Sequence, residues 1–290
     1  MLRAAGERFL AMRVGELLGQ GNVDPRGASA RDLVDRSCLG ARGEGHPAGL
    51  RSPPEDKPSF PVSRLLMLQN DTEIFEFVQQ DLYVAAVCDI LDELGYRQQA
   101  MHQRLRPLLP DVLHCGFVGR ARTVRWMETD YVREDDPYGL EIDLMDSLQA
   151  GDVVVHSTDS GGTNAPWGEL MSTVAKRNGA VGCVCDSQIR DCVKIIALGF
   201  PVYYAGIRPL DSKGRGMVMA YDVPIRCGEV LVRPGELIMA DYDGIVVVPP
   251  EVEKTVLLKA REKVGKEDLT RQELSEGKTL REVYNKYGVL

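Results

Sequence analysis

Residues 179–204, GAVGCVCDSQIRDCVKIIALGFPVYY, contain the pattern that decides the fold. A continuous apolar run over 180–185 is followed by a polar turn, a helical pattern over 193–198 and a second short apolar run. Upstream, 151–156 has the composition of a strand and 170–177 has the apolar spacing of a helix. Strands that alternate with helices pair in parallel, because each helix carries the chain back to the start of the next strand. The sequence therefore predicts an α/β fold with a parallel segment.

The surrounding chain predicts further strands, which would extend this segment into mixed sheets covered by helices. Small or apolar residues alternate with polar ones over 117–126, which is the period of a half-buried strand. A glycine and an acidic residue begin the apolar runs 228–232 and 235–239, and 245–248 is a last apolar run before two prolines. Amphipathic spacing predicts helices over 71–78, 84–94, 142–148, 252–264 and 280–287.

The first 66 residues differ in composition from the rest of the chain. They contain nine Arg but one Lys, and five prolines lie between positions 47 and 61. Their formal charge is +2 (10 basic minus 8 acidic residues), which leaves −10 for residues 67–290. Proline-rich sequence interrupts helices and strands alike. We expect residues 1–66 to be a weakly ordered extension of a domain over 67–290, and in one version of this hypothesis the native chain starts at Met67.

The charge balance argues against nucleic acid as a partner. The chain has 35 Lys and Arg against 43 Asp and Glu, so its formal net charge is −8 and its field repels polyanions. No apolar run approaches the ~18 residues of a membrane-spanning helix, and the N-terminus does not resemble an export signal. Seven cysteines without a CxxC pair fit a reducing compartment. We expect a cytoplasmic protein that binds neither nucleic acid nor membrane.

Two polar loops follow neighbouring strands of the predicted parallel segment. Residues 161–169 enter a helix, and residues 186–191 follow the next strand. In open α/β sheets, ligands bind beyond the carboxyl ends of the strands, where both loops would lie. A helix start offers free N–H groups that suit a carboxylate, and an arginine can bind the same carboxylate through two hydrogen bonds. The sequence thus predicts an anion cradle made by Arg190 and the amides of Leu170 and Met171.

Two carboxylates beside this cradle predict a divalent-metal site. Asp191 and Glu169 are hard oxygen ligands, which suit Mg²⁺ or Mn²⁺ that keeps several waters. No group of His or Cys has the spacing of a zinc site. Each feature alone has an ordinary explanation, since an Arg-Asp pair after a strand is commonly a helix cap and a Gly-Gly-Thr-Asn stretch is commonly a turn. We expect structural or surface roles for the histidines, and a place in the pocket wall or the core for Trp167.

Five motifs, taken in order, resemble one family. They are GFVGRARTV (116–124), GDVVV (151–155), WGEL (167–170), the span 179–191 that ends in Arg190-Asp191, and ADYDGIVVVP (240–249). They are similar to the family of 4-hydroxy-4-methyl-2-oxoglutarate/4-carboxy-4-hydroxy-2-oxoadipate aldolases and the regulator of ribonuclease E activity A. The resemblance to this RraA-like family covers about residues 67–290.

The resemblance implies a fold, an assembly and an activity. The fold is an αββα sandwich of the swivelling β/β/α type, assembled as homotrimers or homohexamers with active sites between subunits. The activity is that of a class II aldolase, which uses a divalent metal such as Mg²⁺ or Mn²⁺ and releases pyruvate from a small 2-oxo acid. Oxaloacetate decarboxylase activity commonly accompanies it.

The resemblance also implies a role for each matching residue. Arg190 would bind the pyruvate carboxylate and C2 oxygen, and Asp191 would be the direct metal ligand. Glu169, 21 residues before Arg190, matches the acidic residue that holds a metal-bound water. In this family a Glu from the C-terminal helical region of a neighbouring subunit orients metal-bound water. Glu267 is the candidate here. Its alternative explanation is an ordinary charged residue on the solvated face of a helix. The substrate-binding backbone groups would belong to Gly168, Leu170 and Met171.

A non-catalytic regulator from the same family is the main alternative, because this fold can also bind a ribonuclease or another protein through its surface. That branch typically lacks the complete acidic set around the metal. Here Glu169, Arg190 and Asp191 are all present, which favours the enzyme. A nucleotide-binding module is disfavoured, because no phosphate-binding glycine motif follows a strand.

Two further features bear on the substrate. The family usually has Asp-Gly before the Arg-Asp turn, whereas this chain has Asp186-Ser187, and serine tolerates fewer backbone conformations than glycine. This difference affects the shape of the loop and thereby the choice of substrate. Lys213 and Arg215 in a Gly-rich loop are candidates for contact with a distal carboxylate, although flexible surface cations are more common.

Overall fold

The computed structural model describes residues 70–109, 111, 115–158 and 162–289. The chain divides into two compact units, Met1–Asp56 and Lys57–Leu290, and all described residues belong to the second. The expected extension over 1–66 and the hypothetical start at Met67 lie outside the described residues. None of the helices in this part of the chain is long and apolar enough to cross a membrane.

The described residues form ten strands: β1 (Arg106–Pro107), β2 (Phe117–Glu128), β3 (Asp152–Thr158), β4 (Gly182–Ile189), β5 (Val202–Ile207), β6 (Gly216–Tyr221), β7 (Ile225–Cys227), β8 (Val230–Val232), β9 (Leu237–Asp241) and β10 (Gly244–Val248). Seven of them lie in one sheet in the order β1-β5-β4-β3-β2-β9-β10, and β6 joins this sheet by pairing with β2. The other two, β7 and β8, form a separate antiparallel hairpin.

The predicted parallel segment is present. Strands β2, β3, β4 and β5 are neighbours and run parallel, with Val155 opposite Val184 and Val184 opposite Tyr203. The pairs made by β1, β6, β9 and β10 are antiparallel, so the sheet is mixed, as predicted. The helices of the described part are α4 (Asp71–Asp81), α5 (Val84–Glu93), α6 (Leu140–Ser147), α7 (Glu169–Arg177), α8 (Cys192–Leu198), α9 (Glu253–Ser275) and α10 (Leu280–Tyr287).

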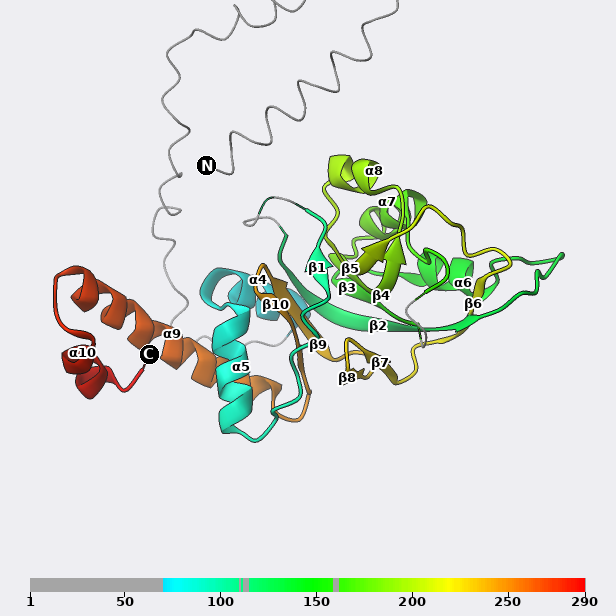
Figure 1. The fold of residues 1–290 in the computed structure, drawn as a ribbon. Helices are drawn as coiled ribbons and strands as arrows, with labels where there is room; N and C mark the ends of the chain where they lie inside the picture. Colours follow the sequence, from blue (N-terminus) through cyan, green and yellow to red (C-terminus); the bar gives the residue numbers. More distant parts are fainter. Residues whose placement is uncertain (1–69, 110, 112–114, 159–161, 290) are drawn as a thin grey trace, which may run out of the picture. The chain divides into compact units, whose positions relative to one another are not determined.

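Three apolar clusters separate the layers of the fold. The first joins α4, α5 and α9 to β9 and β10, and includes Phe77 and Val246. The second lies between the part of the sheet made by β3, β4 and β5 and the part made by β9 and β10. Val184 of β4 and Ile245 of β10 both belong to it. The third joins β3, β4 and β5 to α6, α7 and α8, which lie together in Figure 1, and includes Trp167. Helices, strands, strands and helices therefore follow one another, which confirms the αββα sandwich.

Several elements differ from the expectations, among them β1 and β6, which no sequence pattern predicted. The apolar spacing predicted that the helix beginning near 252 would end at 264, but α9 continues to Ser275. The pattern fades after 264 because the second half of α9 packs against α10 rather than against the sheet. The run 228–232 is the second half of a hairpin whose turn contains Gly228 and Glu229, both with positive φ. The first strand of this hairpin, β7, has only three residues and is too short for a periodic pattern.

The variant Gly119→Ala should destabilise the fold. A Cβ atom at position 119 in β2 would lie 2.2 Å from the carbonyl oxygen of Gly151 and 2.9 Å from the side chain of Val153. Because backbone atoms cannot move aside freely, we expect denaturant unfolding to show a loss of about 1–3 kcal/mol. Gly244→Ala in β10 is the control, since a Cβ there meets no atom within 4 Å. Equal losses in both variants would contradict this packing.

Candidate active site

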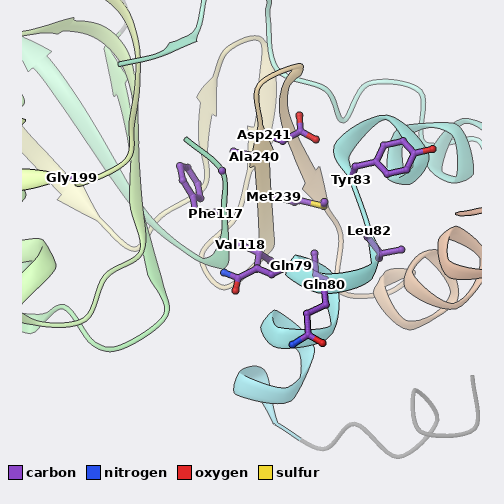
Figure 2. Close-up of a pocket in the computed structure, with 12 residues that line it drawn as sticks. Gln79, Gln80, Leu82, Tyr83, Phe117, Val118, Gly199, Met239, Ala240 and Asp241 are labelled. Atoms are coloured by element: carbon purple, nitrogen blue, oxygen red, sulfur yellow. The ribbon is translucent and has the colours of Figure 1, made fainter. Parts of the chain in front are cut away.

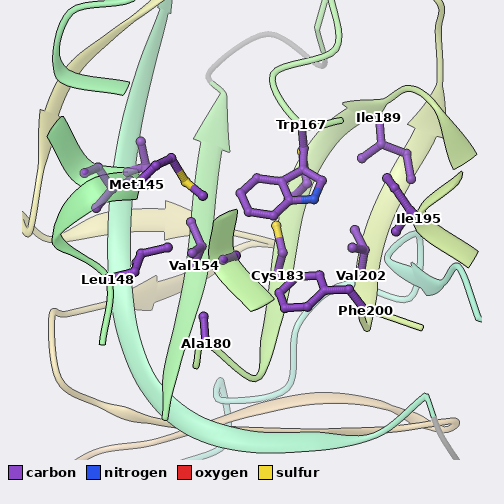
Figure 3. Packing of buried hydrophobic residues seen from close by; sticks show 14 of the residues in the cluster. Met145, Leu148, Val154, Trp167, Ala180, Cys183, Ile189, Ile195, Phe200 and Val202 are labelled. Atoms are coloured by element: carbon purple, nitrogen blue, oxygen red, sulfur yellow. The ribbon is translucent and has the colours of Figure 1, made fainter. Parts of the chain in front are cut away.

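Trp167 anchors the first predicted loop to the end of β4. Its side chain is fully buried, and its ring stacks on Phe200 with 6.2 Å between the centroids (Figure 3). The indole N–H donates to Ser172 Oγ at 2.8 Å, inside α7. The carbonyl oxygen of Trp167 accepts a hydrogen bond of 3.0 Å from the N–H of Arg190, the residue that follows β4. The two predicted loops therefore meet, and Trp167 belongs to the core.

Asp191 has a left-handed backbone at the turn between β4 and α8. Its φ of 59° is uncommon outside glycine, although aspartate and asparagine tolerate it better than other residues. Its carbonyl oxygen accepts hydrogen bonds from the N–H groups of Lys194 and Ile195, so the residue begins α8. The side chain makes no capping hydrogen bond and is 41% exposed. A helix cap therefore explains the backbone of Asp191 but leaves its carboxylate available.

Gly168 allows the carboxylate and the guanidinium of the pair to approach the chain closely. A Cβ atom on Gly168 would lie 3.0 Å from Asp191 Oδ2 and 3.3 Å from Arg190 Nε. The backbone of Gly168 is extended, so its conformation alone does not require glycine. The close contact with Arg190 and Asp191 is thus the physical reason for glycine at this position.

The first turn of α7 lies against the same carboxylate. The N–H of Glu169 donates to Asp191 Oδ2 at 3.4 Å, and the Glu169 carboxylate accepts a hydrogen bond of 3.0 Å from Thr173 Oγ1. The N–H groups of Leu170 and Met171 belong to the first turn, where no helical acceptor exists. The structure thus brings the predicted cradle residues together with Asp191 and Glu169.

Arg190 lies between two carboxylates. Its Nε is 3.7 Å from Asp191 Oδ2, and its Nη2 is 3.2 Å from Asp211 Oδ1. Asp211 also accepts a hydrogen bond of 2.9 Å at Oδ2 from the hydroxyl of Tyr138. Neither Asp211 nor Tyr138 was a candidate from sequence, although Asp211 follows β5 at the sheet edge where the site was expected.

A buried carboxyl, Glu141 in the first turn of α6, lies near this network. Only 8% of the residue is exposed. Burial raises the pKa of Glu141 to about 8, the negative charge of Asp211 adds to this shift and the positive charge of Arg190 opposes it. Glu141 is therefore mostly protonated at neutral pH.

A cavity of 440 Å³ opens beside the Arg190-Asp191 pair. Two further cations, Lys194 and Arg208, line it together with apolar residues such as Ile207. The predicted contacts for a distal carboxylate, Lys213 and Arg215, do not line this cavity. Arg208 was missed although it follows β5, and the register of Ile207 opposite Ile189 places Arg208 next to Arg190.

A second cavity, of 760 Å³, lies between α4, the start of β2 and the end of β9 (Figure 2). Its polar lining includes Gln79, Gln80 and Asp241, which Figure 2 shows around the opening. None of the predicted site residues lines it. The candidate active site is therefore the smaller cavity, which Arg190 and Asp191 line, together with the adjoining first turn of α7, whose residues 168–171 are not part of the cavity lining.

Glu267 lies on α9, away from these groups. Its carboxylate is hydrogen-bonded to the hydroxyl of Tyr83 and lies 3.6 Å from Lys263 Nζ, and burial raises its pKa. Figure 1 shows α9 beside α5, whereas Arg190 precedes α8 on the other side of the sheet. Within one chain the structure does not bring Glu267 to Arg190, so its role across a subunit boundary stays a prediction.

The histidines of the described part do not join the site. His156 is fully buried, accepts a hydrogen bond of 2.7 Å at Nδ1 from the Trp126 indole, and packs edge-on against Trp167. Burial lowers the pKa of His156 to about 3, so the ring stays neutral. His102 lies 3.9 Å from Glu229, and His114 is outside the described residues.

Comparison with known proteins identifies the family. A family model described as RraA-like, Aldolase/RraA, matches residues 84–247, which is more than half of the chain. The chain belongs to the RraA-like family. A Halalkalibacterium halodurans protein named "Putative 4-hydroxy-4-methyl-2-oxoglutarate aldolase" is 35% identical over 159 residues, which cover 55% of this chain and 72% of that protein.

Two solved structures are similar to this RraA-like chain. Streptomyces coelicolor RraAS2, described as an unusual member of the RNase ES inhibitor RraA protein family, aligns with a TM-score of 0.60 and 30% identity over 70% of this chain and 98% of that one. An uncharacterized protein from Pseudomonas syringae aligns with a TM-score of 0.66 and 25% identity over 76% of this chain and 96% of that one. Both support the fold, and they leave the activity open.

The variant Glu141→Gln should make stability less dependent on pH. An unfolded Glu ionises near 4.5 whereas the folded one stays protonated up to about 8, so the wild type loses stability as pH rises between these values. Each pH unit corresponds to about 1.4 kcal/mol, so the variant should gain up to several kcal/mol at pH 8 and little at pH 4. Thermal unfolding at both pH values measures this. Asp146→Asn, which changes an exposed carboxyl on the same helix, is the control, and a gain of equal size at both pH values would contradict the burial of Glu141.

The expected role of Asp191 as a metal ligand leads to a prediction for Gly168→Ala, which should weaken divalent-cation binding without unfolding the protein. The added methyl group would displace the Asp191 carboxylate by a few tenths of an ångström, because it would sit 3.0 Å from Oδ2. Groups that orient a metal ligand commonly change affinity by about 10–100-fold. Calorimetry with Mn²⁺ measures the change, with Gly265→Ala in α9 as the control. Unchanged Mn²⁺ affinity in Gly168→Ala would contradict the expected ligand role of Asp191.

Proposed function

We propose that the chain is a divalent-metal-dependent class II aldolase that cleaves a 4-hydroxy-2-oxo acid, such as 4-hydroxy-4-methyl-2-oxoglutarate, to pyruvate and a second carbonyl product. The convergence of Arg190, Asp191 and the first turn of α7 carries this proposal. A guanidinium, a partly exposed carboxylate and first-turn amides without a helical acceptor are the groups that a 2-oxo acid and a divalent cation require. The name of the similar H. halodurans protein supports the same reaction.

Asp191 and Glu169 fit a divalent cation by the chemistry of their donors. No group of three His, Cys, Asp or Glu side chains converges among the described residues, which disfavours a site built from protein ligands alone. Mg²⁺ commonly takes one or two carboxylates and completes its shell with water and substrate oxygens. Asp191 would hold Mg²⁺ or Mn²⁺ directly, and Glu169 would hold water beside it. When bound, such a cation withdraws electron density from the C2 carbonyl of the substrate.

Arg190 and the α7 amides would bind the pyruvate end of the substrate. The guanidinium donates hydrogen bonds to the carboxylate and the C2 oxygen, and the N–H groups of Leu170 and Met171 donate to the carboxylate. When the C3–C4 bond breaks, its electron pair passes to C3 and negative charge develops on the C2 oxygen of the pyruvate enolate. Arg190 neutralises this charge where it develops, which stabilises the transition state more than the ground state.

Glu169 would direct the removal of a proton from the C4 hydroxyl. This proton must leave as C4 becomes a carbonyl carbon, and a water positioned by the Glu169 carboxylate can accept it. The carboxylate is fixed by its hydrogen bond with Thr173 on the next turn of α7. Decarboxylation of oxaloacetate leaves the same pyruvate enolate and needs no hydroxyl proton. The same groups would therefore also support oxaloacetate decarboxylase activity.

The site is proposed to be completed in a homotrimer or homohexamer. Four large apolar side chains around it are exposed: Leu170, Val193, Ile196 and Ile207. Exposed apolar surface is common at protein–protein contacts and at ligand-binding grooves, which supports a subunit contact here. In such an assembly Glu267 of a neighbouring subunit would approach the metal.

A reducing, cytoplasmic location is supported by the six described cysteines, which are free thiols: Cys88, Cys115, Cys183, Cys185, Cys192 and Cys227.

A non-catalytic role is the second candidate, because the similar S. coelicolor protein is described as a member of an RNase ES inhibitor family. In that role the chain would bind a ribonuclease or another protein through its surface. Arg190 and Asp191 would then have no catalytic role. Catalytic turnover separates the two candidates.

The variant Asp191→Ala should abolish metal-dependent release of pyruvate. The assay uses 4-hydroxy-4-methyl-2-oxoglutarate and oxaloacetate, each with Mg²⁺, Mn²⁺ or EDTA, and the full chain. We expect release with either metal, loss in EDTA, and a fall of more than about 100-fold in the variant, because Asp191 would be the direct ligand. Asp92→Ala, which removes an exposed carboxylate near the end of α5, is the matched control and should keep full activity.

Two results would contradict the aldolase proposal. One is metal-independent pyruvate release that persists in Asp191→Ala. The other is a folded, oligomeric wild type that releases no pyruvate from either compound, which would favour the regulator role or another 2-oxo acid.

A further inference from the structure

The guanidinium of Arg190 pairs with Asp211. The distance from Nη2 to Asp211 Oδ1 is 3.2 Å, shorter than the 3.7 Å from Nε to Asp191 Oδ2. No hydrogen bond or ion pair uses Nη1 of Arg190 within the residues that the structure describes. Asp211 thus pairs with Nη2 of the guanidinium and leaves Nη1 available for a ligand.

Asp211 is itself fixed at both carboxylate oxygens. Oδ2 accepts a hydrogen bond of 2.9 Å from the hydroxyl of Tyr138, and Oδ1 accepts one of 2.8 Å from the N–H of Ser212. Ser212 is buried, and its carbonyl oxygen accepts from the N–H of Arg215 at 2.8 Å, which closes a tight turn. This rigid placement is unusual for an aspartate in a long loop between two strands.

The loop that carries Asp211 is also joined to the loop that carries the cradle. The N–H of Ala165 donates to the carbonyl oxygen of Leu210 at 2.9 Å, and Ala165 precedes Trp167 in the buried segment. A backbone hydrogen bond therefore connects the residue before Asp211 to the segment that leads into α7. Through its ion pair with Nη2, Asp211 can fix the orientation of the Arg190 guanidinium.

Of the three acidic groups near Arg190, Asp211 is the one that would stay available to it as a charged partner. Asp191 would hold the cation, and Glu141 is buried with its pKa raised to about 8. An arginine side chain loses several freely rotating bonds when it is fixed, so prior fixation lowers the cost of binding a carboxylate. Bidentate binding also requires a defined plane of the guanidinium.

We propose that Asp211 is a positioning residue, which orients the Arg190 guanidinium toward the substrate carboxylate, and that the hydroxyl of Tyr138 holds Asp211 in place. This inference rests on the proposed function, in which Arg190 binds the pyruvate end. It assigns a role to the contact between the loop after β5 and the loop before α6.

The test compares Asp211→Asn with a matched control, Asp222→Asn. Asp222 pairs with Arg122 at 2.9 Å, so the control also removes one charge from an Arg-Asp pair, away from the site. We expect Asp211→Asn to raise the KM for oxaloacetate about tenfold, because it weakens binding of the carboxylate, and to lower kcat as well, because a misoriented Arg190 stabilises the developing charge less. A purely structural role would instead lower kcat through a smaller folded fraction at unchanged KM.

Tyr138→Phe provides a second variant that removes one hydroxyl only. It should raise the KM by about threefold, and it should have no further effect in the presence of Asp211→Asn, because both act on one chain of contacts. The affinity for pyruvate in the presence of Mg²⁺, measured by calorimetry, should weaken in parallel with the KM. Thermal unfolding confirms that each variant is folded.

An unchanged or lower KM in Asp211→Asn, with unchanged pyruvate affinity, would overturn the positioning role. Failure of the proposed function is a different result, namely no pyruvate release by the wild type. In that case the calorimetric comparison still decides the role of Asp211. Weaker pyruvate binding in Asp211→Asn than in Asp222→Asn supports it, and equal binding, or no binding by the wild type, overturns it.

Discussion

The carbonyl oxygen of Trp167 accepts a hydrogen bond from the N–H of Arg190, and the indole ring of Trp167 is fully buried. The loop before α7 cannot move away from the end of β4 without opening the core around Phe200. This constraint sets the distance between the first turn of α7 and the Arg190-Asp191 turn. Gly168 then leaves room for both side chains. The placement of Glu169, Arg190 and Asp191 depends on this contact.

The parallel segment and the site edge were predictable from sequence because both follow from local patterns. Strands that alternate with helices place their carboxyl ends at one edge, and this rule alone put Glu169 near Asp191. Asp211 and Tyr138 were not predictable, since each lies in a loop whose path depends on tertiary packing. Glu141 precedes the helix predicted over 142–148, and only its burial in the structure distinguishes it.

The charges around Arg190 form a balanced group. One guanidinium faces the carboxylates of Asp191 and Asp211, and the carboxyl of Glu141 stays mostly neutral because burial raises its pKa. If all three were ionised, they would repel the carboxylate of a 2-oxo acid. With the proposed cation on Asp191 and a proton on Glu141, Arg190 would keep one charged partner. The proposed site would thereby accept an anion in a region rich in acidic groups.

The central claim is that Asp191 and Arg190 place a divalent cation and pyruvate in one site. The most direct measurement is the paramagnetic relaxation of ¹³C-labelled pyruvate by Mn²⁺ in the presence of the protein. The wild type should bind Mn²⁺ and strongly increase the relaxation of the C1 and C2 carbons, and Asp191→Ala should lose both effects. Mn²⁺ that binds without relaxing pyruvate, or that binds equally well to Asp191→Ala, would contradict the claim.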